Sequence, residues 1–321
     1  MNLGVTVGTA KMTPSEVYRS NGTFAVGAFK TGISPFFEYT GVAYQGNFSA
    51  AITLKLPTGV SNVRPTGVNK SGIIVGNSSE FASFTNEGYV WSSPAATPVK
   101  LKSISTTHFC QVQDVNDKGQ MVGQAYDQAA NATFAVFWEN STSVPVLLKM
   151  PAGHPHGYAH KINNNGVIIG GSNNFSTDIN ACYWTQPTAD PQLLPLGSGI
   201  LNVASDLDAN GMVAGYLDNG TIDIPVMWAN GGGAPTILPL LAGQATGRAI
   251  AIHNGVVVGE CGKTPVVWRN GVVKALKDFI ISSSPGTPGL VNEISDSNVV
   301  HAVVPGSPPF SSDIPFAIEL D

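Results

Sequence analysis

A short apolar segment that ends in glycine recurs along the whole chain, and this repetition limits the possible folds. Its copies are TFAVG, GIIVG, QMVG, VIIG, MVAG and VVVG, which end at Gly27, Gly76, Gly123, Gly170, Gly215 and Gly259. A seventh copy, SNVVHA, ends at Ala302. The intervals shorten from 49 residues at the start to 43 at the end. Periods of this length are typical of repeat proteins whose units bury their apolar faces against one another.

The clearest copy of the unit lies in residues 113–150 and reads as four short strands. The first strand ends in the turn Asn116-Asp117-Lys118-Gly119, whose residues tolerate the positive φ of a tight hairpin. The second strand carries the repeated glycine, and the third and fourth cover about residues 134–138 and 144–148. The third strand of five copies ends in tryptophan, and these are all the tryptophans of the chain: Trp91, Trp138, Trp184, Trp228 and Trp268.

Seven second strands predict a seven-bladed β-propeller with four-stranded blades, an all-β fold in a single domain covering residues 1–321. The continuous apolar runs at residues 73–75 and 167–169 fit strands that are covered on both faces. The expected blades span about residues 14–57, 66–104, 111–150, 158–196, 203–240, 248–278 and 290–321.

The two ends of the sequence suggest how the ring closes. The seventh copy supplies only three strands, while residues 3–8 form a spare strand before the first blade. We expect this strand to become the outermost strand of the last blade, because pairing removes two exposed sheet edges.

Composition and charge exclude several classes of function. The net charge is −5 and no cluster of Lys or Arg occurs, which argues against a nucleic-acid partner. No apolar run is long enough to span a bilayer and no signal peptide is recognisable, so we expect no membrane insertion. Cys110, Cys182 and Cys261 are widely spaced, which favours buried small apolar residues over disulfides or a zinc site.

Two motifs resemble metal sites, and both have simpler explanations. His154, His156 and His160 are close in sequence but lack an accompanying carboxylate. Residues 206–211, DLDANG, match the start of a calcium loop, but Leu217 stands where a bidentate Glu is required. Moreover, Gly211 falls on the hairpin glycine of the repeat. We therefore expect no metal and no cofactor, and no catalytic set typical of an enzyme is recognisable.

A ligand site is expected on the face that carries the connections between second and third strands and between blades. These connections are longer and more variable than the turns on the opposite face, and function on rigid scaffolds usually resides in variable loops. If the ligand is a glycan, aromatic side chains on this face would stack on it, and Asn and His would add polar contacts. The candidate residues are Phe81, Phe84, Tyr126, His156, Asn174, Phe175 and Phe310. Several of them could equally be loop anchors.

The repeat resembles the HAF family of bacterial extracellular repeats, whose units run roughly A-x-x-I-N-x-x-G-x-I-V-G, then A-F-x-W, then L. In this chain DVNDKGQMVG, FAVFW and VLL correspond to it, and the match is best over residues 68–276. The resemblance implies a propeller blade and supplies no catalytic residues. Proteins with such repeats are typically exported. A Gly- and Thr-rich chain without a signal peptide is similar in this respect to phage virion components, which leave the cell by lysis.

These observations favour a non-enzymatic propeller that acts as a binding or structural module. We expect it on a virion or an extracellular surface, contacting a host receptor, a glycan or a protein partner such as another virion protein. The alternative is a carbohydrate-active enzyme, a glycosidase or lyase, with carboxylates at the propeller channel. An intracellular scaffold is a third reading.

Overall fold

The structure is a computed structural model, and it describes residues 16–21, 23–33, 36–45, 51–78, 86–173, 180–230, 232–279, 289–295, 299–304 and 314–320. The described residues form β-strands, turns and one short 3-10 helix, η1 (Leu276–Phe279). The expectation of an all-β fold is confirmed. The predicted closing strand, residues 3–8, lies outside the described residues.

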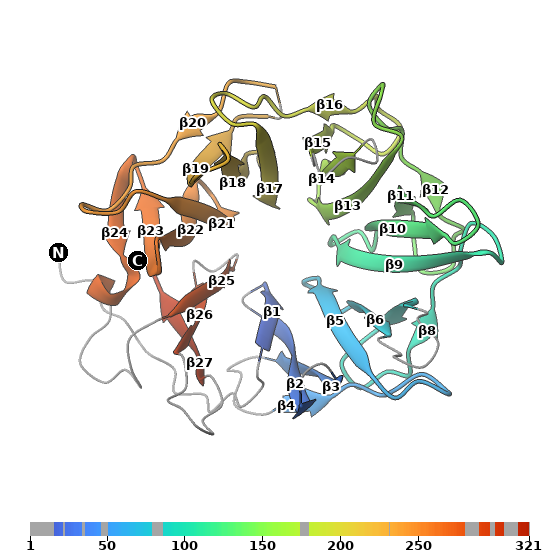
Figure 1. Cartoon of the computed structure of the whole chain (residues 1–321). Coiled ribbons are helices and arrows are strands. Elements are labelled where there is room, and N and C mark those ends of the chain that lie inside the picture. The colour runs from blue at the N-terminus through green and yellow to red at the C-terminus, as the bar shows by residue number, and fades with distance from the viewer. Residues whose placement is uncertain are drawn as a thin grey trace.

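The strands form seven antiparallel sheets arranged around a common centre (Figure 1). The first sheet contains β1 (Glu16–Ser20), β2 (Phe24–Ile33), β3 (Phe36–Gln45) and β4 (Ala51–Thr53). The second contains β5 (Val63–Val68), β6 (Ile74–Ser78), β7 (Gly88–Trp91) and β8 (Val99–Lys100). The third contains β9 (His108–Val115), β10 (Met121–Asp127), β11 (Ala132–Trp138) and β12 (Val146–Leu147). The fourth contains β13 (His156–Ile162), β14 (Ile168–Asn173), β15 (Asn180–Trp184) and β16 (Gln192–Leu193). The fifth contains β17 (Leu201–Leu207), β18 (Val213–Asp218), β19 (Asp223–Trp228) and β20 (Thr236–Ile237). The sixth contains β21 (Gly247–His253), β22 (Val256–Cys261), β23 (Thr264–Arg269) and β24 (Val272–Ala275). The seventh contains β25 (Leu290–Ile294), β26 (Val299–Val304) and β27 (Ile314–Glu319).

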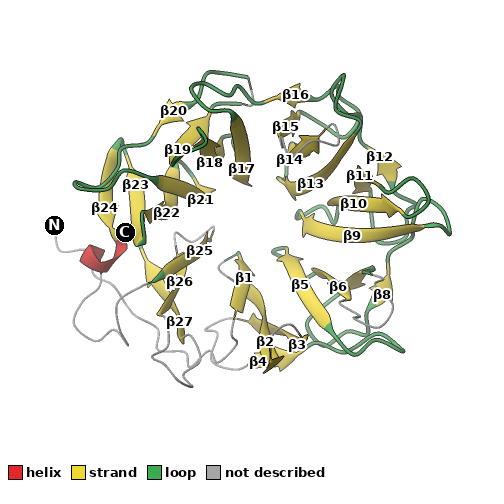
Figure 2. Ribbon diagram, in the orientation of Figure 1, coloured by secondary structure: helices red, strands yellow, loops and turns green. Residues whose placement is uncertain are grey.

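Each sheet is a meander whose strands follow one another in chain order, with its first strand innermost (Figure 2). Six of the described sheets have four strands and the last has three, β25 to β27. Strand β1 of the first sheet contacts β25 of the last, so the seven sheets follow one another around a ring. This arrangement fits a seven-bladed propeller. Because the strands alternate in direction, one face, the loop face, carries the connections β6–β7 and β8–β9 and their counterparts. The opposite face, the turn face, carries the hairpins such as β9–β10.

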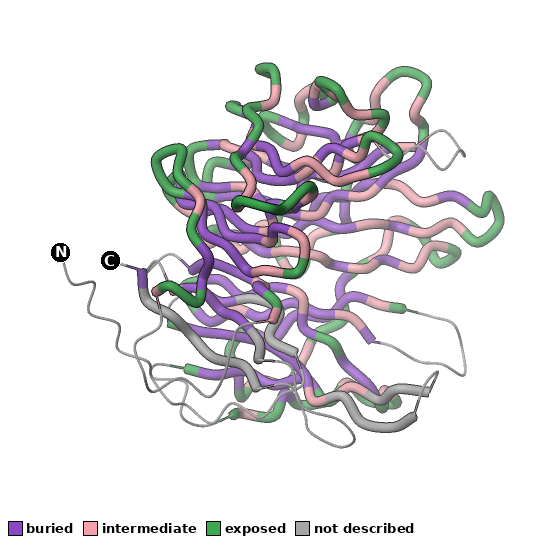
Figure 3. Tube along the Cα trace, turned by 60° about the vertical axis from the view of Figure 1, so that its left-hand side comes forward, coloured by how far each residue is buried: buried purple, intermediate pink, exposed green. Residues whose placement is uncertain are grey.

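The apolar core lies between neighbouring sheets. One cluster joins Val122 and Phe137 of the third sheet to Ile168 and Trp184 of the fourth, and other junctions contain similar clusters. Figure 3 shows that the buried segments lie within the sheets, whereas the exposed segments are mostly the connections between strands. Each sheet is therefore covered on both faces, which explains why its second strand is continuously apolar.

The repeated tryptophans link successive blades by hydrogen bonds. All five are at most 2% exposed. Each indole Nε1–H donates to a backbone carbonyl that follows the fourth strand of the preceding blade, at 2.6 to 3.0 Å. The donor and acceptor pairs are Trp91–Lys55, Trp138–Lys102, Trp184–Lys149, Trp228–Pro195 and Trp268–Pro239. A buried indole N–H needs such an acceptor. Tryptophan therefore recurs in the sequence because each copy makes the same contact with the preceding blade.

The repeated glycine is explained by a close approach of two backbones. A Cβ at Gly123 would lie 1.9 Å from the carbonyl oxygen of Gln111 on the neighbouring strand β9. The same distance is found at Gly170 and Gly215. No other residue type fits such a position without a backbone shift. The close approach occurs because strand β9 contains an extra residue opposite the glycine.

Candidate functional site in the central channel

The innermost strand of every described sheet contains a β-bulge at the same position. In β9 the register passes from Val112 to Asp114 and leaves Gln113 unpaired. The residues that the strand register skips in the seven sheets are Tyr18, Thr66, Gln113, His160, Ser205, Ile250 and Asn292. A bulge bends its strand and re-aims a side chain, and bulges are often found beside functional sites. Each blade thus has one bulge residue at the same structural position, and the residue type differs from blade to blade.

Six of these bulge residues line a cavity of about 690 Å³ at the loop-face end of the channel, which we call the mouth cavity: Thr66, Gln113, His160, Ser205, Ile250 and Asn292. It is bordered by residues of the inner strands β5, β9, β13, β17, β21 and β25, and by Asn77 and Asn86 on either side of the β6–β7 connection. Its size falls within the range of ligand pockets. The bulge residues that line it are half-buried, as expected for side chains facing a solvent-filled opening.

Toward the turn face, an ion pair separates the mouth cavity from a second cavity. The ammonium group of Lys161 lies 3.3 Å from Asp206 Oδ1, and both side chains are less than 10% exposed. Asp206 Oδ2 also accepts the backbone N–H of Ile252 in the next blade at 2.9 Å. Asp114 accepts the N–H of Ile162 at 3.1 Å in the same way. These charged side chains therefore connect adjacent blades around the channel.

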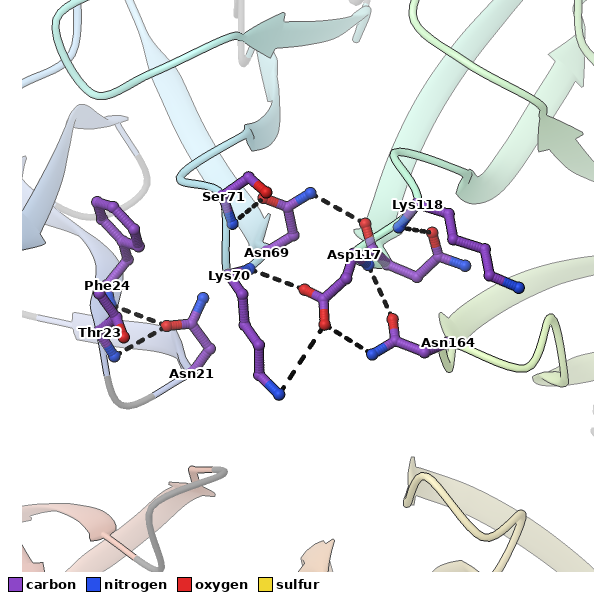
Figure 4. A network of polar contacts seen from close by, with 10 residues as sticks. Asn21, Thr23, Phe24, Asn69, Lys70, Ser71, Asp117, Lys118 and Asn164 are labelled. Atoms are coloured by element: carbon purple, nitrogen blue, oxygen red, sulfur yellow. Dashed lines mark hydrogen bonds and ion pairs between the residues drawn. The ribbon is translucent and has the colours of Figure 1, made fainter.

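The second cavity, the turn cavity, has a volume of about 150 Å³ and is bordered by the first hairpin turns of the blades. Asparagine side chains connect these turns into a ladder, and Figure 4 shows its first contact, from Asn69 to the turn that contains Asp117. The amide Nδ2 of Asn69 donates to the carbonyl of Asn116 at 3.0 Å, and Asn116 donates to the carbonyl of Asn163 at 3.1 Å. Asn163 in turn donates to the carbonyl of Asp208 at 2.9 Å.

Each ladder residue also holds its own turn. Asn116 Oδ1 accepts the backbone N–H groups of Lys118 and Gln120, both at 3.0 Å. The turn glycine Gly119 has a φ of 78°, which confirms the hairpin predicted from the sequence. Asp208 plays the same part in the fifth sheet, where its Oδ1 accepts from Asn210 and Met212. The sequence that matches a calcium loop is therefore one more hairpin of the repeat.

A second series of contacts runs one position further along the turns. The carboxylate of Asp117 accepts the backbone N–H of Lys70 at 2.8 Å and the side-chain amide of Asn164 at 2.6 Å (Figure 4). Asn164 Oδ1 accepts the N–H of Asp117 at 2.8 Å. The turn face is thus a rigid, hydrogen-bonded surface in this part of the ring.

Two of the seven residues expected to bind a glycan are described, and neither lines the mouth cavity. Tyr126 lies at the end of β10 and donates its hydroxyl to Asn131 Oδ1 at 2.9 Å. His156 is buried, and its ring lies 5.9 Å from the ring of Phe134. The remaining candidates lie outside the described residues: Phe81, Phe84, Asn174, Phe175 and Phe310.

The histidine cluster is divided among different surroundings. His154 lies 3.3 Å from Ser172 Oγ, His156 packs against Phe134, and His160 is the bulge residue of β13. Among the residues that the structure describes, no group of three His, Cys, Asp or Glu side chains converges as a metal site would require. The three cysteines are buried and free, and burial raises the pKa of the Cys182 thiol to about 12. This confirms their interpretation as small apolar residues.

The sequence alone does not identify the bulge residues as a ring. A signal is present, because Thr66, Gln113, His160 and Ser205 each stand three residues before the first residue of the hairpin turn. Only the register of the strands shows that this position is the extra residue of a bulge, and the structure places it beside the channel.

Comparison with known proteins supports the fold alone. No family model and no curated protein matches the chain. Among solved structures, it is similar to the β-propeller domain of the Trilobed protease from Pyrococcus furiosus, with a TM-score of 0.56 at 10% identity over 94% of this chain and 93% of that one. YCF48 bound to D1 peptide matches with a TM-score of 0.53 at 10% identity over 100% of this chain and 96% of that one.

A third similar structure is the Pyrococcus horikoshii acylaminoacyl peptidase, with a TM-score of 0.57 at 11% identity over 91% of this chain. This chain spans half of that peptidase. No helix in the described part of the structure is long and apolar enough to cross a membrane. The propeller implied by the HAF resemblance is thus supported by structural neighbours, and the chain is similar in fold to propeller domains of proteins with different roles.

Proposed function

We propose that this chain is a non-enzymatic propeller that binds a segment of another protein at the mouth cavity. The observation that carries the proposal is the ring of bulge residues. The tryptophans, glycines and turn asparagines repeat because they build the blades, whereas the bulge residues differ from blade to blade. Variation at equivalent places on a rigid scaffold is what a binding site of defined specificity needs.

A protein ligand is consistent with the chemistry of the cavity. Its lining includes Gln113 and Asn292, whose amide groups can donate to and accept from a peptide backbone. The amide of Asn77, which also lines the cavity, already exchanges two hydrogen bonds with the backbone of Val112. Among the described residues that line it, Tyr158 is the only Phe, Tyr or Trp, so it offers few stacking surfaces for sugars. One propeller of similar fold, YCF48, is bound to a peptide.

The alternative, a carbohydrate-active enzyme, would need free carboxylates at the channel. Asp114 accepts the N–H of Ile162, and Asp206 holds both Lys161 and the N–H of Ile252. Carboxylates held in this way are suited to joining blades. We therefore keep the non-enzymatic proposal.

The place of action is proposed from the repeat motif. Its resemblance to an exported family supports a propeller on a virion or cell surface, where the loop face would contact a host receptor. Saturable binding of the labelled chain to bacterial cells would support this placement, and the absence of such binding would remove it.

A closed ring is part of the same proposal. We propose that residues 1–321 form one propeller domain and that residues 3–8 pair with β27 as the fourth strand of the last blade. The support is that the last described sheet has three strands where the other six have four. A complete ring would hold all seven bulges in fixed positions.

The test is selection of peptides on the immobilised full chain from a displayed library of unstructured peptides. Affinities are then measured for the natural chain, for Ser205→Trp in the mouth cavity and for Ser92→Trp on the exposed turn between β7 and β8. We expect Ser205→Trp to abolish binding, because the indole occupies the cavity, and Ser92→Trp to retain it. Failure to select any peptide, or equal binding by both variants with unchanged melting temperatures, would contradict the proposal.

A further inference from the structure

The two ends of the channel differ in the charge of the residues that border them. Arg64 and Lys161 line the mouth cavity, and none of the described residues that line it is Asp or Glu. This is unusual for a chain whose net charge is −5. The guanidinium group of Arg64 lies 5.6 Å from the centre of the Tyr39 ring, a contact that helps to orient it at the edge of the cavity.

The turn cavity has the opposite character. Its border includes the five acidic residues Asp114, Asp117, Asp206, Asp208 and Glu293, against the two lysines Lys70 and Lys161. Lys161 borders both cavities and forms the buried ion pair with Asp206. The charge therefore changes sign along the channel at this ion pair, from basic at the loop face to acidic at the turn face.

A cavity with walls of low dielectric constant concentrates this field. A negatively charged group that enters from the loop face is attracted by Arg64 and by the remaining hydrogens of the Lys161 ammonium group. The carboxylates of the turn cavity oppose its passage beyond the ion pair. An anion is consequently favoured in the mouth cavity, near Arg64 and Lys161, when it enters from the loop face.

The uncharged part of the lining indicates the kind of molecule that carries the anion. Side-chain amides and hydroxyls predominate among the described residues, including Gln111, Gln113, Thr66 and Ser205. Amides of this kind match the alternating donors and acceptors of an extended backbone. Tyr158 is the only Phe, Tyr or Trp among the described residues of the lining, which favours a peptide over an acidic glycan.

We propose that the mouth cavity binds an acidic peptide segment, whose carboxylates are held by Arg64 and Lys161 and whose backbone is held by the amides of the bulge ring. This specificity rests on the proposed function, because it assumes that the mouth cavity is the binding site. Binding weakens as salt increases, since the attraction between ligand carboxylates and the cavity is screened.

The experiment measures fluorescence anisotropy of three labelled peptides of equal length on the full chain. One peptide alternates Glu with Gly-Ser, the second has Gln in place of Glu and the third has Lys. The protein variants are Gln113→Glu, which places a carboxylate in the cavity, and Gln192→Glu on the exposed strand β16 as the control of equal charge. A labelled oligogalacturonate supplies an acidic glycan.

We expect the Glu peptide to bind most tightly and Gln113→Glu to weaken it about tenfold, the scale of one like charge at short range. Gln192→Glu leaves its binding unchanged. Equal affinity for the Glu and Gln peptides, with both lost in Ser205→Trp, overturns the acidic specificity and leaves the binding function standing. No binding of any peptide contradicts both. Equal effects of the two Glu variants, or binding of the oligogalacturonate alone, overturns the inference.

Discussion

The ammonium group of Lys161 and the carboxylate of Asp206 meet 3.3 Å apart across the junction of two blades, with both side chains almost fully buried. They occupy equivalent positions, two residues beyond Ala159 and Ala204, directly after the bulge residues His160 and Ser205. The repeat therefore places opposite charges on neighbouring blades at the same depth of the channel. This contact separates the mouth cavity from the turn cavity.

Removal of one partner should destabilise the ring. In Asp206→Asn the Lys161 charge is buried without its counter-charge, and we expect a loss of about 3 kcal/mol in the free energy of unfolding. The double variant Lys161→Met with Asp206→Asn should lose less, because no buried charge is left uncompensated. Denaturant titration of the natural chain and the variants measures the difference. A double variant that is less stable than Asp206→Asn would show that the pair does not act in this way.

The close approach at the bulge makes the repeated glycine irreplaceable in the central blades. In Gly123→Ala the new Cβ would lie 1.9 Å from the Gln111 carbonyl oxygen, so the backbone must move, and we expect a loss of about 3 kcal/mol or more. Gly232→Ala is the control, because its Cβ would have its nearest neighbour at 3.6 Å. Thermal unfolding compares the two, and equal melting temperatures would refute the explanation.

The asparagine ladder is interrupted at Asp208, which points to a stabilising substitution. Asp208 is buried, and its Oδ2 has no hydrogen-bond partner among the described residues, whereas the equivalent Nδ2 of Asn163 donates to the next turn. Asp208→Asn keeps the acceptor for the N–H groups of Asn210 and Met212 and supplies a donor.

We expect Asp208→Asn to raise the free energy of unfolding by about 1 kcal/mol, the usual contribution of one hydrogen bond. The control is Asp190→Asn at an exposed ion pair with Lys149, where the change should be near zero. Thermal unfolding at neutral pH measures both, and a lower melting temperature for Asp208→Asn would contradict the ladder.

His301 should make the last described sheet sensitive to acid. It occupies the second-strand slot held elsewhere by Val75, Val122, Ile169 and Val258, and burial lowers its pKa from 6.5 to about 4. The unfolded chain therefore takes up a proton between these values that the folded chain does not.

The stability contributed by neutral His301 is present above pH 6.5 and is lost as the pH falls toward about 4. The free energy of unfolding of the natural chain should therefore fall between pH 7 and pH 5, in part because of His301. In His301→Val this part of the pH dependence should disappear. Unfolding free energies at a series of pH values test the prediction. An unchanged slope in the variant would show that other groups are responsible.

Deletion of residues 1–10 should leave the last blade without its outer strand. We expect a markedly lower melting temperature and aggregation, because an unpaired edge can pair with another chain. The full-length variant Leu3→Ser, Val5→Ser and Val7→Ser keeps the length and removes the apolar side chains, and it should show a smaller loss. A deletion that melts like the full chain would contradict the proposed closure.

The local periodicity of the sequence determined the fold class. Gly123 and its equivalents, the turn glycines and the five tryptophans each have one main structural reason, so their repetition could be read as blades without coordinates. The number of sheets follows from the same count. These features are predictable because steric limits and buried hydrogen bonds act over short distances, within one blade or between adjacent blades.

The location of the candidate site follows from the arrangement of the blades in space. Gln113, His160 and Ser205 have no common residue type, and a single extra residue in each inner strand determines that they border one cavity. The change of sign along the channel depends likewise on Lys161 and Asp206, which are 45 residues apart in sequence. A cavity and its electrostatic field depend on the distances between residues of several blades. The linear sequence pattern does not contain these distances.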